Sequence, residues 1–133
     1  MRNIILIADP SENNRAAFKN AFEGSFVIVE AEDEKQAIKL MSELGKKMCA
    51  VIADYSLRDN GALSVLKFME ATGEVGKFPV IFMTPFNFDD EDVKEYADEI
   101  DDIIEKPFSI DIAERRVRNL VDLYNYRRSK LSE

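Results

Sequence analysis

Short apolar runs alternate with longer amphipathic segments along almost the whole chain. The runs are nearly continuous and rich in Ile, Val and Ala, and they span residues 3–8, 26–29, 50–53, 79–83 and 103–104. Strands that are buried on both faces have this composition, and such strands occur in parallel sheets covered by helices. The pattern therefore predicts five parallel strands.

The segments between and after these runs carry apolar residues at helical spacing. They predict helices at residues 14–22, 34–44, 62–69, 90–100 and 110–131. Ser11, Asp33, Asp89 and Ser109 lie where N-caps are expected. Five strand–helix units in succession predict a single α/β domain, a doubly wound (βα)5 sheet.

Four of the five runs end in a residue suited to phosphate chemistry: Asp9, Asp54, Thr84 and Lys106. With strand order 2-1-3-4-5, ligands bind beyond the carboxyl ends of the strands, between strands 1 and 3. A carboxylate can attack phosphorus, while a lysine and a hydroxyl can hold the oxygens of the transferred group. We therefore expect Asp9 and Asp54 to face each other, with Thr84 and Lys106 closing a phosphoryl site.

Composition narrows the possible functions. The formal net charge of −8 argues against binding to nucleic acid or an anionic membrane. Histidine is absent, which removes histidine phosphotransfer and most zinc chemistry, and the single Cys49 fits a reducing cytoplasm. No apolar segment approaches the roughly 20 residues of a membrane span. The turn after the first run lacks glycine, which excludes dinucleotide and P-loop sites.

At these motifs the sequence resembles the response-regulator receiver domain, over about residues 3–125. The matching segments are ILIADPSENNR (5–15), AVIAD (50–54), PVIFMT (79–84) and EKPF (105–108). The resemblance implies a flavodoxin-like fold and a cytoplasmic signalling module that is not an enzyme. A histidine kinase or phosphotransfer protein would phosphorylate it, and the face of the fourth helix, fifth strand and last helix would change.

The resemblance also assigns the site. Asp54 is similar to the phosphoacceptor, Asp9 to the first acidic magnesium ligand, and the Ser56 backbone carbonyl to another ligand of Mg²⁺. Thr84 resembles the switch hydroxyl, and Lys106 the lysine of the family, with an implied cis bond to Pro107.

Several positions depart from the family pattern. Pro10 replaces the second acidic ligand, Pro85 follows the switch threonine, and Ile103 stands at the switch aromatic. The loop after Asp54 reads YSLRDNG, without the usual Met-Pro. We therefore expect weak Mg²⁺ binding. The alternative hypothesis is a degenerate pseudo-receiver that acts as a phosphorylation-independent dimerisation or interaction module.

The last predicted helix is longer than a receiver needs, and it resembles helices that lead into cyclic-di-nucleotide output domains. A 4-3-4-3-4 spacing typical of a coiled-coil seam runs through Ala113, Val117, Leu120, Tyr124, Arg127 and Leu131. We expect a receiver domain at 1–123 and an extension at 124–133, a linker to an output domain absent from this chain. The alternatives are a single-domain regulator with a long tail and an ordinary core-facing helix.

Two further expectations concern exposure. Tyr124 and Leu131 should be exposed beyond the domain body, where a homodimer through the last helix would cover them. The pair Asp101-Asp102 should form a solvated turn before the fifth strand.

Overall fold

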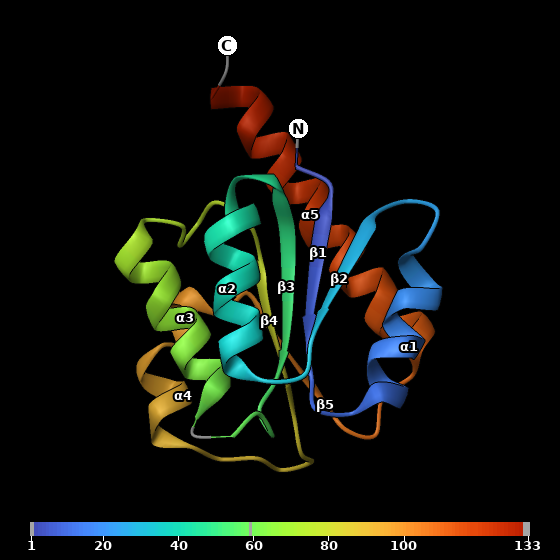
Figure 1. Ribbon diagram of the computed structural model, residues 1–133, viewed down its shortest axis with the longest axis vertical. Helices are drawn as coiled ribbons and strands as arrows, with labels where there is room; N and C mark the ends of the chain where they lie inside the picture. The colour runs from blue at the N-terminus through green and yellow to red at the C-terminus, as the bar shows by residue number, and fades with distance from the viewer. Residues whose placement is uncertain (1, 59, 132–133) are drawn as a thin grey trace.

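A computed structural model describes residues 2–58 and 60–131 and contains a five-stranded parallel sheet between two layers of helices (Figure 1). The strands are β1 (Ile4–Ala8), β2 (Val27–Ala31), β3 (Met48–Asp54), β4 (Val80–Thr84) and β5 (Asp102–Glu105). Their order is β2-β1-β3-β4-β5, and every pairing is parallel. The predicted flavodoxin-like (βα)5 fold is therefore confirmed.

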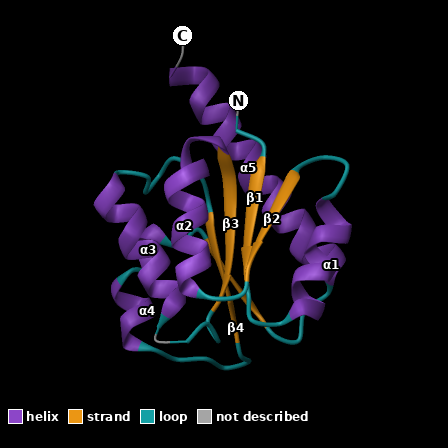
Figure 2. Cartoon of the chain, in the orientation of Figure 1, coloured by secondary structure: helices purple, strands orange, loops and turns teal. Residues whose placement is uncertain are grey.

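The helices divide between the two faces of the sheet (Figure 2). One face is covered by α1 (Glu12–Phe22) and α5 (Ile110–Leu131). The other is covered by α2 (Glu34–Leu44), α3 (Gly61–Thr72) and the short α4 (Glu91–Glu95). Two 3-10 turns, η1 (Gly45–Lys47) and η2 (Ala97–Glu99), precede β3 and β5.

The three central strands explain why their sequence does not alternate. Every residue of β1, β3 and β4 is buried, whereas the edge strands β2 and β5 are partly exposed. Side chains from the two faces of the central strands enter two separate hydrophobic clusters, one under each helical layer. Cys49 lies fully buried in β3, and burial raises the pKa of its thiol to about 11.

The fourth helix is shorter than predicted. Asp90, not Asp89, is the N-cap, and its Oδ1 accepts hydrogen bonds from the N–H groups of Asp92 (2.7 Å) and Val93 (3.3 Å). The helix ends at Glu95 and is followed by η2 rather than continuing to residue 100. Asp98 and Glu99 would lie at the C-terminal end of such a helix, where the helix dipole disfavours negative charge. The caps predicted at Ser11 and Asp33 are confirmed.

The last helix packs along the domain body over residues 113–124, so this part of the predicted coiled-coil seam faces the core. Ala113, Val117 and Tyr124 are buried with Val121, which makes this the core-facing side of α5. Tyr124 is only 7% exposed, and its hydroxyl donates a 2.6 Å hydrogen bond to Asp101 Oδ1. Leu131 is 87% exposed, as predicted. Of the extension expected at 124–133, residues 132–133 lie outside the described residues.

The pair that was expected to be a solvated turn has partners on both sides. Asp101 Oδ2 accepts a hydrogen bond from the Val80 N–H at 2.8 Å, while its other oxygen accepts from Tyr124. Asp102 accepts two hydrogen bonds from the Arg116 guanidinium, at 2.8 and 2.5 Å. These carboxylates attach α5 to the sheet near β5. None of the helices within the described ranges has the length and apolar character of a membrane span.

Candidate functional site

The four predicted site residues gather at the carboxyl edge of the sheet. Asp54 and Thr84 are the last residues of β3 and β4, and Asp9 and Lys106 directly follow β1 and β5. Asp9, Asp54 and Thr84 are buried, and about a third of the Lys106 side chain is exposed. The parallel register sets this arrangement, because the strands all end at the same edge.

Asp54 is held as a carboxylate by two partners. Its Oδ1 accepts a 2.8 Å hydrogen bond from the Ser56 N–H, and its Oδ2 lies 2.5 Å from the ammonium nitrogen of Lys106. Burial alone would raise the pKa of Asp54, but Lys106 and Ser56 outweigh burial and hold the pKa below its usual value. The group is therefore ionised at neutral pH, as a nucleophile must be.

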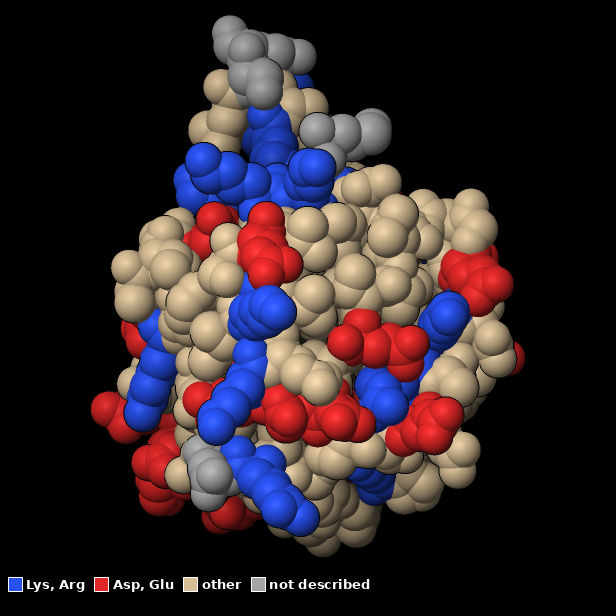
Figure 3. Space-filling model, viewed as in Figure 1, with Lys and Arg blue, Asp and Glu red and all other residues tan. Residues whose placement is uncertain are grey.

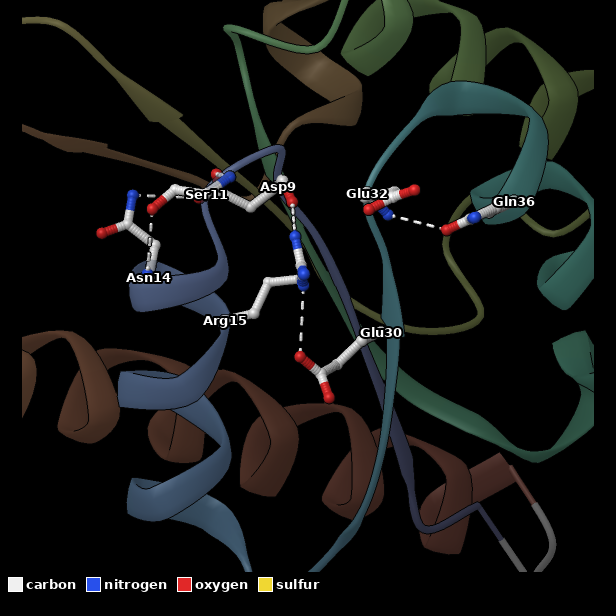
Figure 4. Close-up of polar contacts among 7 residues, drawn as sticks. All are labelled: Asp9, Ser11, Asn14, Arg15, Glu30, Glu32 and Gln36. Atoms are coloured by element: carbon white, nitrogen blue, oxygen red, sulfur yellow. Dashed lines mark hydrogen bonds and ion pairs between the residues drawn. The ribbon is translucent and has the colours of Figure 1, made fainter.

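Asp9 is held differently, by the turn that begins α1 (Figure 4). Its Oδ1 accepts from the Ser11 N–H at 2.8 Å, and its Oδ2 accepts from the Asn14 side-chain amide at 3.2 Å. Burial raises the pKa of Asp9, and the negative charge of Asp54 raises it further. The Asp9 and Asp54 carboxylates therefore repel each other within the site.

Two residues that support Asp9 were missed in the sequence. The Asn14 amide reaches Asp9, and Arg15 donates through Nη1 to the Asp9 carbonyl at 2.6 Å while its Nε lies 3.2 Å from Glu30 Oε1. Ser11 was recognised as the N-cap, and its spacing places Asn14 and Arg15 in the first turn of α1. That spacing was the signal that could have identified them.

The Thr84 hydroxyl has no hydrogen-bond partner within the described part of the chain, although its oxygen is buried. A buried polar group without a partner costs about 1–3 kcal/mol. A phosphoryl oxygen on Asp54 would give this hydroxyl a partner. Phe86, two residues further on, is 68% exposed, so most of its ring contacts solvent.

The two buried carboxylates at this edge of the sheet, those of Asp9 and Asp54, could hold Mg²⁺. A divalent cation would offset the repulsion between the two carboxylates. Mg²⁺ often binds one or two carboxylates and keeps several waters. Pro10 adds no ligand, and a cavity of about 390 Å³ lies there, lined by Pro10, Glu32, Asp33, Ser56 and Arg58. Across residues 2–58 and 60–131, no group of three or more His, Cys, Asp or Glu side chains could hold a metal ion.

The β2–α2 loop beside this cavity is fixed by its own contacts. The Glu32 N–H donates a 2.9 Å hydrogen bond to Gln36 Oε1 (Figure 4), and Asp33 Oδ1 accepts from the Gln36 N–H at 2.8 Å. The Asp33 side chain therefore serves as the N-cap of α2.

A parallel (βα)5 sheet with a buried, lysine-paired aspartate at the end of its third strand is the arrangement typical of a receiver domain. The family described as the response regulator receiver domain matches residues 5–118, and the chain belongs to that family. The Lys106-Pro107 bond is cis, as the resemblance implied.

Solved structures with the same fold include other receiver domains. The signal receiver domain of a putative Luxo repressor protein from Vibrio parahaemolyticus is 21% identical, with a TM-score of 0.82, and the match covers 100% of this chain and 98% of that chain. A Francisella response regulator receiver domain is 24% identical, with a TM-score of 0.74 and coverage of 91% and 98%. A receiver-modulated diguanylate cyclase from Pelobacter carbinolicus is 21% identical, with a TM-score of 0.74 and coverage of 96% and 98%. No curated protein matches the chain.

Proposed function

We propose that this receiver accepts a phosphoryl group on Asp54 from a histidine kinase or a phosphotransfer protein. The observation that carries the proposal is the buried Asp54 carboxylate, paired at 2.5 Å with Lys106 in a site where the buried Thr84 hydroxyl has no partner among the described residues. This set combines a nucleophile, a cation and a hydrogen-bond donor that can meet the phosphoryl oxygens.

In the proposed reaction, an Asp54 carboxylate oxygen attacks phosphorus in a phosphohistidine of the donor. An acyl phosphate forms as the P–N bond breaks, and the bonding electrons leave with the imidazole nitrogen. Lys106 offsets charge on the phosphoryl oxygens, and Thr84 donates to one of them. Pro85 has no N–H to contribute.

Mg²⁺ would be held by Asp9, Asp54 and the Ser56 carbonyl, and when bound it supplies charge neutralisation at the phosphoryl oxygens. We expect the affinity to be low, because Pro10 offers no carboxylate. Both oxygens of Asp9 already accept hydrogen bonds from Ser11 and Asn14, which hold the side chain in place without a metal.

The output of the switch would be a change at the α4-β5-α5 face. Phosphate can act there only through contacts that differ between two states of the domain. A homodimer through α5 remains part of the proposal. Because Tyr124 is buried, other side chains of this helix would form the dimer surface. The side chains that are exposed and apolar on this helix are Ile112, Leu123, Tyr126 and Leu131. Sedimentation of Leu123→Lys, with loss of the dimer expected, would test that surface.

The second candidate is a phosphorylation-independent interaction module, and Pro10 is the observation that favours it. Treatment with acetyl phosphate and Mg²⁺, followed by intact mass measurement, separates the two candidates. A gain of one phosphoryl group that disappears in Asp54→Asn supports phosphorylation at Asp54. A gain that survives in Asp54→Asn refutes the assignment, and no gain in the wild type favours the interaction module.

A further inference from the structure

Tyr55, the residue after the phosphoacceptor, reaches the start of α4. Its hydroxyl donates a 2.5 Å hydrogen bond to Asp90 Oδ2, and its ring lies 4.3 Å from that of Phe88, measured between centroids. Both rings are partly buried against the hydrophobic cluster under α2, α3 and α4. The contact joins residues 35 positions apart in the sequence.

The contact matters for α4 because Asp90 is the N-cap of this helix. One oxygen of its carboxylate accepts from Tyr55, while the other accepts from the first N–H groups of α4, those of Asp92 and Val93. The helix is only five residues long, and so short a helix depends on its cap and its packing. The Tyr55 hydroxyl thus holds the residue that caps α4.

The loop that leads to α4 is attached to the phosphoryl site at both ends. It starts after Thr84, whose buried hydroxyl lacks a partner among the described residues, and it ends at Asp90, which Tyr55 holds. The backbone directly after Asp54 is tied to β4, since the Tyr55 N–H donates to the Met83 carbonyl at 2.8 Å. A shift of Thr84 toward Asp54 must be absorbed within the loop or passed on to Asp90.

Ile103, which stands where the receiver family carries a switch aromatic, offers no alternative way to transmit a change at Thr84. Ile103 in β5 is partly exposed and has no hydroxyl with which to respond to Thr84. Tyr55 is the tyrosine next to Asp54, and both its ring and its hydroxyl contact the segment between β4 and α4.

We infer that Tyr55 is the positioning residue that couples Asp54 to α4. In the unphosphorylated domain its hydroxyl fixes the N-cap Asp90. When a phosphoryl group on Asp54 draws Thr84 in, the loop shifts, the bond from Tyr55 to Asp90 opens and α4 loosens. This regulation rests on the proposed function, because it requires phosphorylation of Asp54.

Hydrogen–deuterium exchange of the full chain tests the inference on peptides that cover residues 85–100. Tyr55→Phe keeps the ring and removes the hydroxyl. Tyr96→Phe is the matched control, since the Tyr96 hydroxyl has no hydrogen bond among the described residues. The Tyr96 ring, which the variant keeps, packs against the same hydrophobic cluster and lies 6.0 Å from Lys67 Nζ. Without a phosphodonor, α4 amides of Tyr55→Phe should exchange roughly tenfold faster than those of the wild type, as expected for a lost bond to a carboxylate. Tyr96→Phe should match the wild type.

The same peptides are then measured after treatment with acetyl phosphate and Mg²⁺. Phosphorylation should raise α4 exchange in the wild type and in Tyr96→Phe, but change it little in Tyr55→Phe, where the bond is already absent. A hydroxyl with only a structural role would raise exchange in both states and leave the response to phosphate intact. Equal exchange in Tyr55→Phe and the wild type, or an undiminished response, overturns the inference.

Intact mass of the same samples separates this outcome from failure of the proposed function. If the wild type gains no phosphoryl group, the proposed function and the coupling fail together. If all three proteins gain the group but α4 in Tyr55→Phe still responds as in the wild type, only the coupling fails. Asp90→Asn gives a second variant that keeps a capping oxygen, and its α4 response should be reduced in the same way.

Discussion

Lys106 Nζ lies 2.5 Å from Asp54 Oδ2 and joins the residue after β5 to the last residue of β3. β4 lies between these two strands in the sheet, so the ion pair spans the strand that ends in Thr84. The pairing holds Asp54 in its charged form despite burial. The strand order therefore brings the lysine to the carboxylate, and removing the lysine should affect both the proposed reactivity and the stability.

Lys106→Met should lower the free energy of unfolding by about 2 kcal/mol at pH 7, less than for a fully buried pair because the lysine is partly exposed. The pKa of Asp54 lies below its unfolded value, so the stabilisation exists above the unfolded pKa and is lost as pH falls through the folded pKa. Urea unfolding between pH 7 and pH 3 measures this. The exposed Lys35→Met is the control, and an equal loss in that variant would contradict the prediction.

Asp9→Asn should stabilise the domain at pH 7 by about 1 kcal/mol, because it removes a buried charge beside Asp54. The raised pKa of Asp9 means that folding favours its protonated form, so the wild type is penalised once pH rises through the folded pKa. The advantage of the variant should therefore shrink as pH is lowered toward the unfolded pKa. Thermal unfolding at several pH values tests this, with the exposed Glu43→Gln as control; a lower midpoint for Asp9→Asn at pH 7 would refute it.

Pro10→Asp should tighten Mg²⁺ binding roughly tenfold, since a third carboxylate would join Asp9 and Asp54 around the ion. Pro10→Ala is the matched control, because it removes the proline ring without adding a ligand. Calorimetric titration of all three proteins with MgCl₂ measures the affinities. Equal affinities for the wild type and Pro10→Asp would show that the residue at position 10 does not limit the site.

Tyr124→Phe should lower the free energy of unfolding by about 1–2 kcal/mol, because Asp101 would lose a buried hydrogen-bond donor. Tyr126→Phe, on the exposed side of the same helix, should have almost no effect. Urea unfolding monitored by circular dichroism compares the two. The result would place the boundary of the domain body beyond residue 124; equal stability of both variants would return Tyr124 to the extension.

Alkaline pH should weaken the domain partly through Tyr55. Burial, together with the hydrogen bond to Asp90, raises the pKa of Tyr55 from 10.0 to about 12. Its stabilising effect is full below the unfolded pKa and is lost as pH rises through the folded value. Tyr55→Phe should therefore be less stable than the wild type at pH 8, and the difference should narrow toward pH 12 in thermal unfolding curves. A difference that stays constant would exclude this titration.

The sequence predicted most of the fold because the central strands are buried on both faces. Such burial leaves uninterrupted Ile, Val and Ala runs, which differ from the mixed sequences of the described helices. The sequence also predicted that four residues gather at one edge of the sheet: Asp9, Asp54, Thr84 and Lys106. The end of each apolar run marks the end of a strand, and parallel strands end at the same edge. The contact of Tyr124 with Asp101 was not predictable in this way. A 4-3-4-3 spacing faces a core or a partner helix equally well, and only the packed structure shows which one it meets.

The contacts made by residues next to the site were harder to infer, because they too depend on how the chain packs. Tyr55 and Asp90 are far apart in sequence, and an acidic run before a helix is explained by the helix dipole alone. Asn14 could have been inferred, because an N-cap at Ser11 fixes which side chains of the first turn face back toward Asp9.

The buried thiol of Cys49 makes the chain convenient for site-directed labelling. Its side chain is inaccessible in β3, and at neutral pH almost none of it is the reactive thiolate, given a pKa of about 11. A maleimide dye or spin label added to the native protein should leave it untouched. A cysteine introduced at an exposed position such as Glu95 would then be the one reactive site, and the mobility of a single spin label there would report on α4 without first deleting the native thiol.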